Sequence, residues 1–102
     1  RVGSIGDNRL GGWYGYRASK AGLNQLIRTA SIELAMRRPE AICVSLHPGT
    51  VLTPLSKPFM SSHKGNAFSA VASANYILDV IDKLHIHDTG GFFDWQGKSI
   101  PW

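Results

Sequence analysis

A short and nearly uninterrupted run of small and apolar residues, Ala41 to Leu46, constrains the fold of this chain more than any other feature. Pro39 precedes the run, and Pro48-Gly49 follow it. Such a run is typical of a strand buried on both faces of a parallel sheet. A strand of this kind needs neighbouring strands for its backbone groups and other elements to cover its apolar sides. We therefore predict a parallel-sheet strand over residues 41–46.

Apolar residues recur at helical spacing on both sides of that strand. The first set predicts a helix over residues 13–37, which ends by Arg38 because Pro39 disfavours the α conformation in the residue before it. The second set predicts a helix over residues 67–84. We interpret the stripe of the first helix as core-facing. The stripes are Leu23, Ile27, Ala30 and Leu34 in the first helix, and Ala67, Ala70, Val71, Ala74, Leu78 and Ile81 in the second.

Loops and one further short strand account for the remaining segments. Residues 1–12 contain four glycines and show no periodicity, which predicts a glycine-rich loop. Residues 47–66 contain three prolines and two glycines, and a loop of this length is typical of a lid or binding segment. Residues 92–95 predict a last strand and residues 96–99 a turn. The order loop, helix, strand, long loop, helix, strand is typical of the back half of an alternating α/β sheet.

Composition and charge exclude several classes of protein. The chain has 102 residues, is 43% hydrophobic and 18% charged, and contains no apolar run near the roughly 20 residues that span a bilayer. Its formal net charge of +4 suggests an anionic partner, but only Arg37-Arg38 are adjacent among the basic residues of its first forty positions. We therefore expect neither nucleic acid nor membrane as a partner; a small basic nucleic-acid binder is the alternative that rests on charge alone.

The cysteine and histidine residues do not indicate a disulfide or a metal centre. Cys43 is the single cysteine and lies in the apolar run, where a buried thiol is expected. His85 and His87 are spaced to share one face of a strand, but no third or fourth ligand completes a zinc site, so we interpret them as polar turn residues. Nothing indicates secretion, and we expect a cytoplasmic location.

Tyr16 and Lys20 lie four residues apart at the start of the first predicted helix, which places them one turn apart on the same face. An ammonium close to a phenol favours the phenolate and so makes the tyrosine a usable acid and base near neutral pH. Taken alone the pair is also typical of surface residues. Its context strengthens it, because the segment Pro48-Gly49-Thr50-Val51-Leu52-Thr53 follows 28 residues after Lys20, at the end of the predicted strand.

These two segments, Tyr16–Lys20 and Pro48–Thr53, resemble the Tyr-x-Ala-Ser-Lys and Pro-Gly-x-Val-x-Thr motifs of the short-chain dehydrogenase/reductase family, in the same order. The resemblance covers essentially the whole chain, and residues 97–102 resemble C-factor-like and carbonyl-reductase-like members. It implies the C-terminal portion of a single NAD(P)-binding domain, a Rossmann-type doubly wound parallel sheet that is incomplete in these 102 residues. The resemblance makes residues 13–37 the catalytic helix and residues 48–66 the substrate loop.

The resemblance also implies roles for individual residues. Tyr16 is the acid/base that gives a proton to a carbonyl oxygen or takes one from an alcohol, and Lys20 activates it and binds the nicotinamide ribose. Pro48, Gly49 and Val51 are expected to lie against the nicotinamide, with backbone groups of Val51 holding the carboxamide. The remaining implied positions are Thr53, which binds the carboxamide or the pyrophosphate, and Leu55, Phe59 and Met60, which line the substrate pocket.

The implied function is hydride transfer between NAD or NADP and a small carbonyl or alcohol substrate, with no metal. The family's catalytic serine corresponds to the position before Arg1, and Ser4 is the nearest hydroxyl that could replace it. The glycine-rich dinucleotide fingerprint is also not among these residues, so the choice of NAD or NADP is not determined, and we expect the 102 residues alone to be inactive. Alternatives are a non-catalytic Rossmann-type binding or signalling protein, and an inactive truncated fragment. A monomer and a homodimer both remain open.

Overall fold

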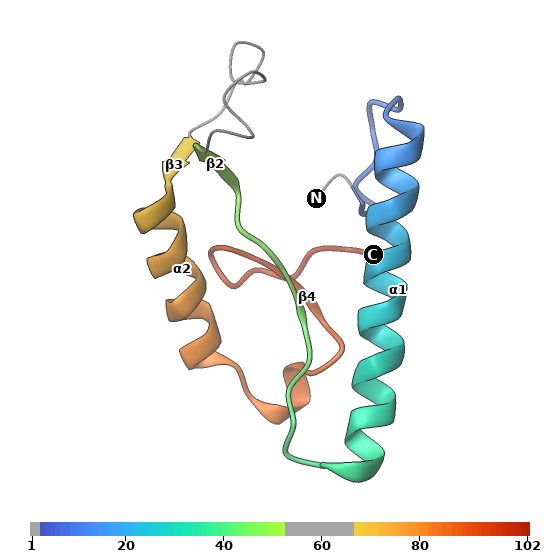
Figure 1. Ribbon diagram of the computed structural model, residues 1–102, viewed down its shortest axis with the longest axis vertical. Helices are drawn as coiled ribbons and strands as arrows, with labels where there is room; N and C mark the ends of the chain where they lie inside the picture. The colour runs from blue at the N-terminus through green and yellow to red at the C-terminus, as the bar shows by residue number, and fades with distance from the viewer. Residues whose placement is uncertain (1–2, 53–66) are drawn as a thin grey trace.

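The computed structural model describes residues 3–52 and 67–102, and its elements follow the predicted α/β order. The two helices lie on opposite sides of a central pair of strands, β1 and β4 (Figure 1). The elements in chain order are α1 (Tyr14–Arg37), β1 (Ser45–His47), β2 (Thr50–Leu52), β3 (Ala67–Ser69), α2 (Ala70–Lys83), the 3-10 helix η2 (Ile86–Asp88) and β4 (Phe92–Asp94).

Strand β1 pairs with β4 in parallel, in the register Ser45 to Phe92 and His47 to Asp94. The strand is shorter than the predicted 41–46 and lies further along the chain, so that prediction was wrong in its bounds. The reason lies at Cys43, whose N–H donates to the Thr89 side-chain oxygen at 2.9 Å. A side chain thus replaces the main-chain partner that a continuous ladder would need, and the segment before Ser45 is extended without being a strand.

A second parallel pair, β2 with β3, lies within and just after the segment predicted to be a long loop. Val51 is opposite Phe68 in this pair, which therefore brackets residues 53–66. Helix α2 begins three residues later than predicted because the Ser69 hydroxyl accepts a hydrogen bond from the Ala72 N–H at 3.1 Å. A serine in this position satisfies one of the free N–H groups at a helix start.

Helix α1 matches its predicted bounds, but its apolar stripe is not core-facing as predicted. Leu23 is 46% exposed and Leu34 is 41% exposed, whereas the buried residues of the helix are Asn24 and Ser31. The N-terminal segment approaches α1 closely at Gly3, where a Cβ would lie 2.5 Å from the Lys20 Cβ. At this glycine the polar backbone of the N-terminal segment packs directly against the helix. Together with the buried Asn24 and Ser31, this means that α1 contacts the rest of the described chain partly through polar groups.

An aromatic cluster of Phe68, Tyr76 and Trp95 joins β3, α2 and the end of β4. Its ring centroids lie 4.6 to 5.0 Å apart in edge-to-face and tilted arrangements, which are favourable for aromatic pairs. Gly49 packs against this cluster with φ +80°, and a Cβ there would lie 2.7 Å from the Phe68 ring. The turn after β1 therefore needs glycine both for its backbone conformation and for the space that the rings occupy.

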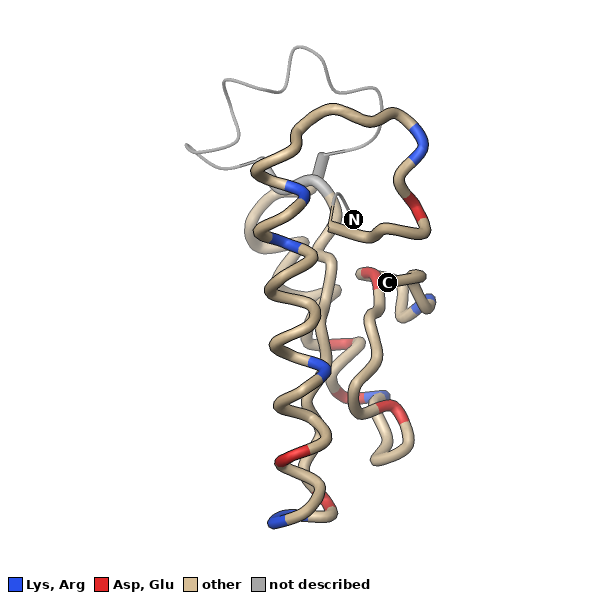
Figure 2. The backbone as a smooth tube through the Cα atoms, turned by 90° about the vertical axis from the view of Figure 1, so that its right-hand side faces the viewer, with Lys and Arg blue, Asp and Glu red and all other residues tan. Residues whose placement is uncertain are grey.

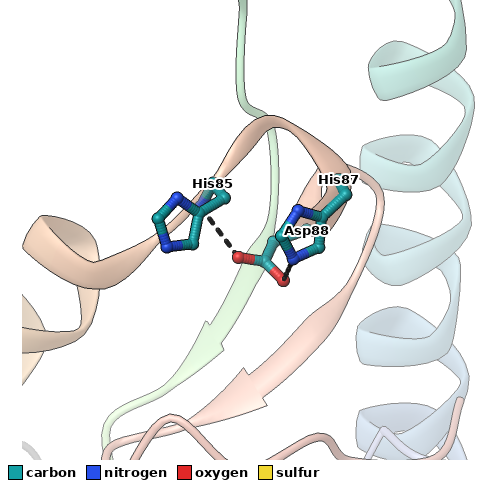
Figure 3. Close-up of polar contacts among 3 residues, drawn as sticks. All are labelled: His85, His87 and Asp88. Carbon is teal, nitrogen blue, oxygen red and sulfur yellow. Dashed lines mark hydrogen bonds and ion pairs between the residues drawn. The ribbon is translucent and has the colours of Figure 1, made fainter.

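The two histidines lie at a 3-10 helix and not on a strand face. The Asp88 carboxylate accepts a hydrogen bond from the His85 N–H at 2.8 Å and lies 3.6 Å from His87 Nε2 (Figure 3). The two imidazole rings stack with centroids 5.4 Å apart. Among residues 3–52 and 67–102, no group of three or more His, Cys, Asp or Glu side chains is arranged to hold a metal ion.

Charged residues are scattered over the described part of the chain. Those of α1 are spread along its length, and others lie in the loops (Figure 2). No helix in the described ranges combines the length and the apolar character needed to cross a membrane.

The Asp94 side chain organises the turn that follows β4. It is buried, and its Oδ1 accepts hydrogen bonds from the N–H groups of Gln96 at 2.8 Å and Lys98 at 2.9 Å. The turn returns the chain so that the Ile100 N–H donates to the Phe92 carbonyl at 2.8 Å. One side-chain oxygen therefore holds the segment that carries the C-terminus back to the centre of the molecule.

Replacing Asp94 tests this arrangement. We expect Asp94→Ala to lower the free energy of unfolding by about 1–3 kcal/mol, because two main-chain N–H groups lose a charged acceptor. Asp94→Asn should cost less, since its side-chain carbonyl can accept both bonds from the same place. The measurement is urea unfolding, with the exposed Asp79→Ala as a control that should stay within about 0.5 kcal/mol of the wild type. Equal losses in Asp94→Ala and Asp94→Asn would contradict the role of Oδ1.

Candidate functional site

Tyr16 and Lys20 occupy the first turns of α1, on the same face as predicted. The Lys20 Nζ lies 5.6 Å from the centre of the Tyr16 ring. The Tyr16 side chain is 48% exposed, and that of Lys20 is also exposed. The Tyr16 carbonyl accepts a hydrogen bond from the Ser19 hydroxyl at 2.8 Å, a bond local to the helix. A phenol and a neighbouring ammonium are thus both open to a ligand from outside the helix.

A cavity of about 490 Å³ brings this pair together with the end of strand β1. Ligands of α/β sheets bind outside the carboxyl ends of the strands, and the cavity includes that end of β1. It combines an apolar wall with a few polar groups, which is the usual composition of a small-molecule site. Its lining residues are Gly3, Tyr16, Lys20, Leu23, Asn24, Ile27, Val44, Ser45, Leu46, His47, Pro48, Gly49 and Phe92.

Four of the six positions predicted from the sequence therefore line one cavity: Tyr16, Lys20, Pro48 and Gly49. Val51 follows in β2, two residues beyond the glycine. The other predicted positions lie outside the described residues: Thr53, Leu55, Phe59 and Met60.

Asn24 is a cavity residue that sequence reasoning did not single out. It is 8% exposed and lies one helical turn after Lys20, on the face that Tyr16 and Lys20 share. A polar side chain that is buried on an otherwise apolar wall is informative, because such groups need hydrogen-bonding partners. The sequence does contain one feature that could have identified Asn24: Tyr16, Lys20 and Asn24 are spaced i, i+4, i+8, which places them on one helix face.

Arg17 holds the segment before α1. It is half-buried, and its guanidinium donates to the carbonyls of Gly12 at 2.8 Å and Gly11 at 3.1 Å. Trp13 follows directly and contacts the Tyr16 ring edge-to-face, with centroids 5.8 Å apart. The loop and the first turn of the helix thus form one connected structure around Tyr16.

Ser4 does not line the cavity and has a structural role. Its side chain is 1% exposed, and its hydroxyl donates to the Pro101 carbonyl and accepts from the Asp7 N–H at 3.1 Å. Beside it, the Gly6 N–H donates to the Trp102 carbonyl at 2.8 Å. Ser4 therefore fastens the C-terminal tail to the N-terminal segment, and the alternative that placed it among the reacting groups is not supported.

Comparisons with known proteins give close relatives but no matching family model. The C-signal protein of Myxococcus xanthus is 42% identical, over 100% of this chain and 57% of the relative. A 1-hydroxy-2-glutathionyl-2-methyl-3-butene dehydrogenase of Rhodococcus sp. strain AD45 is 34% identical, over 100% of this chain and 43% of the relative. The chain thus spans about half the length of these curated relatives.

Two solved structures share the fold. The carbonyl reductase Sniffer of D. melanogaster superimposes with a TM-score of 0.82 and 35% identity, over 99% of this chain and 38% of that structure. An NADPH-bound carbonyl reductase from chicken fatty liver superimposes with a TM-score of 0.79 and 34% identity, over 99% of this chain and 39% of that structure. The described chain therefore has the fold of the corresponding part of these reductases.

Removing the Ser4 hydroxyl tests its structural role. We expect Ser4→Ala to raise the amide hydrogen-exchange rate of Gly6 about five-fold, because loss of one hydrogen bond of about 1 kcal/mol loosens the contact between the two ends. The exposed Ser99→Ala serves as the control and should leave the Gly6 rate unchanged. An unchanged rate in Ser4→Ala would show that the two ends are held together without this hydroxyl.

Proposed function

The chain belongs to the short-chain dehydrogenase/reductase family, and from this premise we propose that it supplies the acid/base and nicotinamide-binding groups of an NAD(P)-dependent oxidoreductase. The predicted Rossmann-type α/β class is confirmed by the two superimposed reductases. The observation that carries the proposal is the cavity in which Tyr16 and Lys20 lie with the Pro48-Gly49 turn.

Tyr16 is the proton donor and acceptor in this proposal. During reduction its hydroxyl gives a proton to the carbonyl oxygen of the substrate, and during oxidation it takes one from the alcohol. A positioned acid/base of this kind contributes about 10²- to 10⁴-fold to the rate. The half-exposed ring on the cavity wall supports this role, because the hydroxyl must reach a substrate that enters from solvent.

Lys20 activates Tyr16 and binds the ribose next to the nicotinamide. Its ammonium carries three donors on a flexible stem, which suits ribose hydroxyls, and it faces the same cavity as the tyrosine ring. The Pro48-Gly49 turn lines the same cavity. The described residues that line the cavity therefore fit the nicotinamide half of the cofactor, and the contacts predicted for Val51 and Thr53 stay predictions.

The nicotinamide, when bound, supplies the hydride, and the chain supplies orientation and the proton. The carbonyl reductases among the similar structures support a small carbonyl or alcohol as the substrate. NAD and NADP both remain open. A cytoplasmic location stays a prediction.

The decisive experiment replaces Tyr16 in the full gene product that contains these residues. We expect Tyr16→Phe to lower NAD(P)H-dependent turnover of a carbonyl substrate by at least about 100-fold, while the cofactor still binds, because only the proton is lost. Tyr14→Phe is the matched control: Tyr14 is 89% exposed on the same helix and should be replaceable with less than about a two-fold change. Turnover and cofactor affinity are measured separately, by NAD(P)H absorbance and by titration.

Lys20→Met distinguishes the two roles of the lysine. It should weaken cofactor binding and slow turnover, whereas Tyr16→Phe should slow turnover alone. Near-normal turnover in Tyr16→Phe would refute the assignment. Binding of the cofactor without turnover in the wild-type protein would instead favour the alternative of a non-catalytic binding or signalling protein.

A further inference from the structure

We propose that Trp13 is a substrate-positioning residue, which selects carbonyl compounds that carry an aromatic ring next to the reacting carbonyl. This inference rests on the proposed function of Tyr16 and adds the substrate class. It is carried by three observations on the loop before α1: the backbone conformation of Trp13, the clamp that holds it, and the exposed indole against the Tyr16 ring.

Three consecutive residues before α1 adopt the left-handed conformation. Gly11 has φ +68°, Gly12 has φ +71° and Trp13 has φ +59°. Glycine adopts such angles readily, but a bulky side chain does so at a cost in free energy. Trp13 is the one non-glycine residue with positive φ in the described part of the chain. Strained residues of this kind persist where the surrounding structure enforces them, and they concentrate at functional sites.

The Arg17 side chain holds the segment before α1 in this conformation. Its guanidinium donates through Nε to the Gly12 carbonyl at 2.8 Å and through Nη2 to the Gly11 carbonyl at 3.1 Å. The planar guanidinium holds both carbonyls in one geometry, which a lysine ammonium would not do. Because Arg17 lies in the first turn of α1 beside Tyr16, the clamp fixes the loop relative to the reacting hydroxyl.

The result is an indole that contacts the Tyr16 ring and is open to solvent, next to the residues that line the cavity and not among them. Trp13 is 62% exposed although it is among the largest apolar side chains, and its ring meets the Tyr16 ring at 80°. In this edge-to-face contact the indole keeps apolar surface free for another ring, and stacked or edge-to-face aromatic pairs are favourable. Since it touches the ring that bears the reacting hydroxyl, an aryl group attached to a bound carbonyl lies within its reach.

The test compares two substrates in two variants of the full gene product. Trp13→Gly removes the indole and relieves the left-handed strain, so it does not endanger folding; Trp13→Phe keeps an aromatic ring. We expect Trp13→Gly to lower kcat/KM for acetophenone by at least about ten-fold, mainly through KM, and to change kcat/KM for 2-butanone by less than about two-fold. Trp13→Phe should recover most of the loss for acetophenone.

The control is Leu10→Ala, which removes another exposed apolar side chain from the same loop, 95% exposed and three residues before Trp13. It should leave both substrates unaffected. Equal losses for acetophenone and 2-butanone in Trp13→Gly, or no loss for either, would overturn the proposal.

A binding measurement separates this proposal from the proposed function. The indole resonance of Trp13, assigned by its disappearance in Trp13→Phe, should shift when acetophenone is added and not when 2-butanone is added. If the wild-type protein turns over neither compound with either nicotinamide, the proposed function fails, and a shifted Trp13 resonance still supports aryl recognition. An unshifted resonance with saturating acetophenone overturns it whatever the turnover.

Discussion

The parallel pairing of β1 with β4 is the constraint on which the rest of this structure depends. It brings the end of β1 to the cavity wall, and the turn that follows presents Pro48 and Gly49 opposite α1. The same pairing is extended backward by the Gly90 N–H, which donates to the Cys43 carbonyl at 2.7 Å, and by the Ser45 N–H, which donates to the Gly91 carbonyl at 3.0 Å. Without this ladder the turn would have no fixed position relative to Tyr16.

The sequence was sufficient to predict the elements whose signals are local. The end of α1 follows from Pro39, and the pairing of Tyr16 with Lys20 on one face follows from helical spacing alone. The order of elements predicted the α/β class, and the similar reductase structures confirm it. The motif residues Pro48 and Gly49 reach the cavity because they end a strand, which the apolar run before them already indicated.

The features that the sequence did not predict depend on contacts between distant residues. The start of β1 is set by the Thr89 side chain, 46 residues beyond the Cys43 N–H to which it bonds. The strand pair β2 and β3 has only three residues in each strand, too few for periodicity to appear. The structural role of Ser4 also depends on a distant contact, because its hydroxyl bonds the Pro101 carbonyl near the other end of the chain.

The exposure of Tyr16 and Lys20 also bears on how the proposed chemistry can work. Two unit charges about 4 Å apart attract by about 1 kcal/mol in bulk water and by about 4 kcal/mol at the effective dielectric constant near a protein surface. A ligand that fills the 490 Å³ cavity would displace water from it, and electrostatic interactions are stronger in such a site than in bulk water. Under the proposed function, the contacts of Tyr16 and Lys20 with a bound ligand are therefore stronger than the exposure of the two side chains in the unliganded structure suggests.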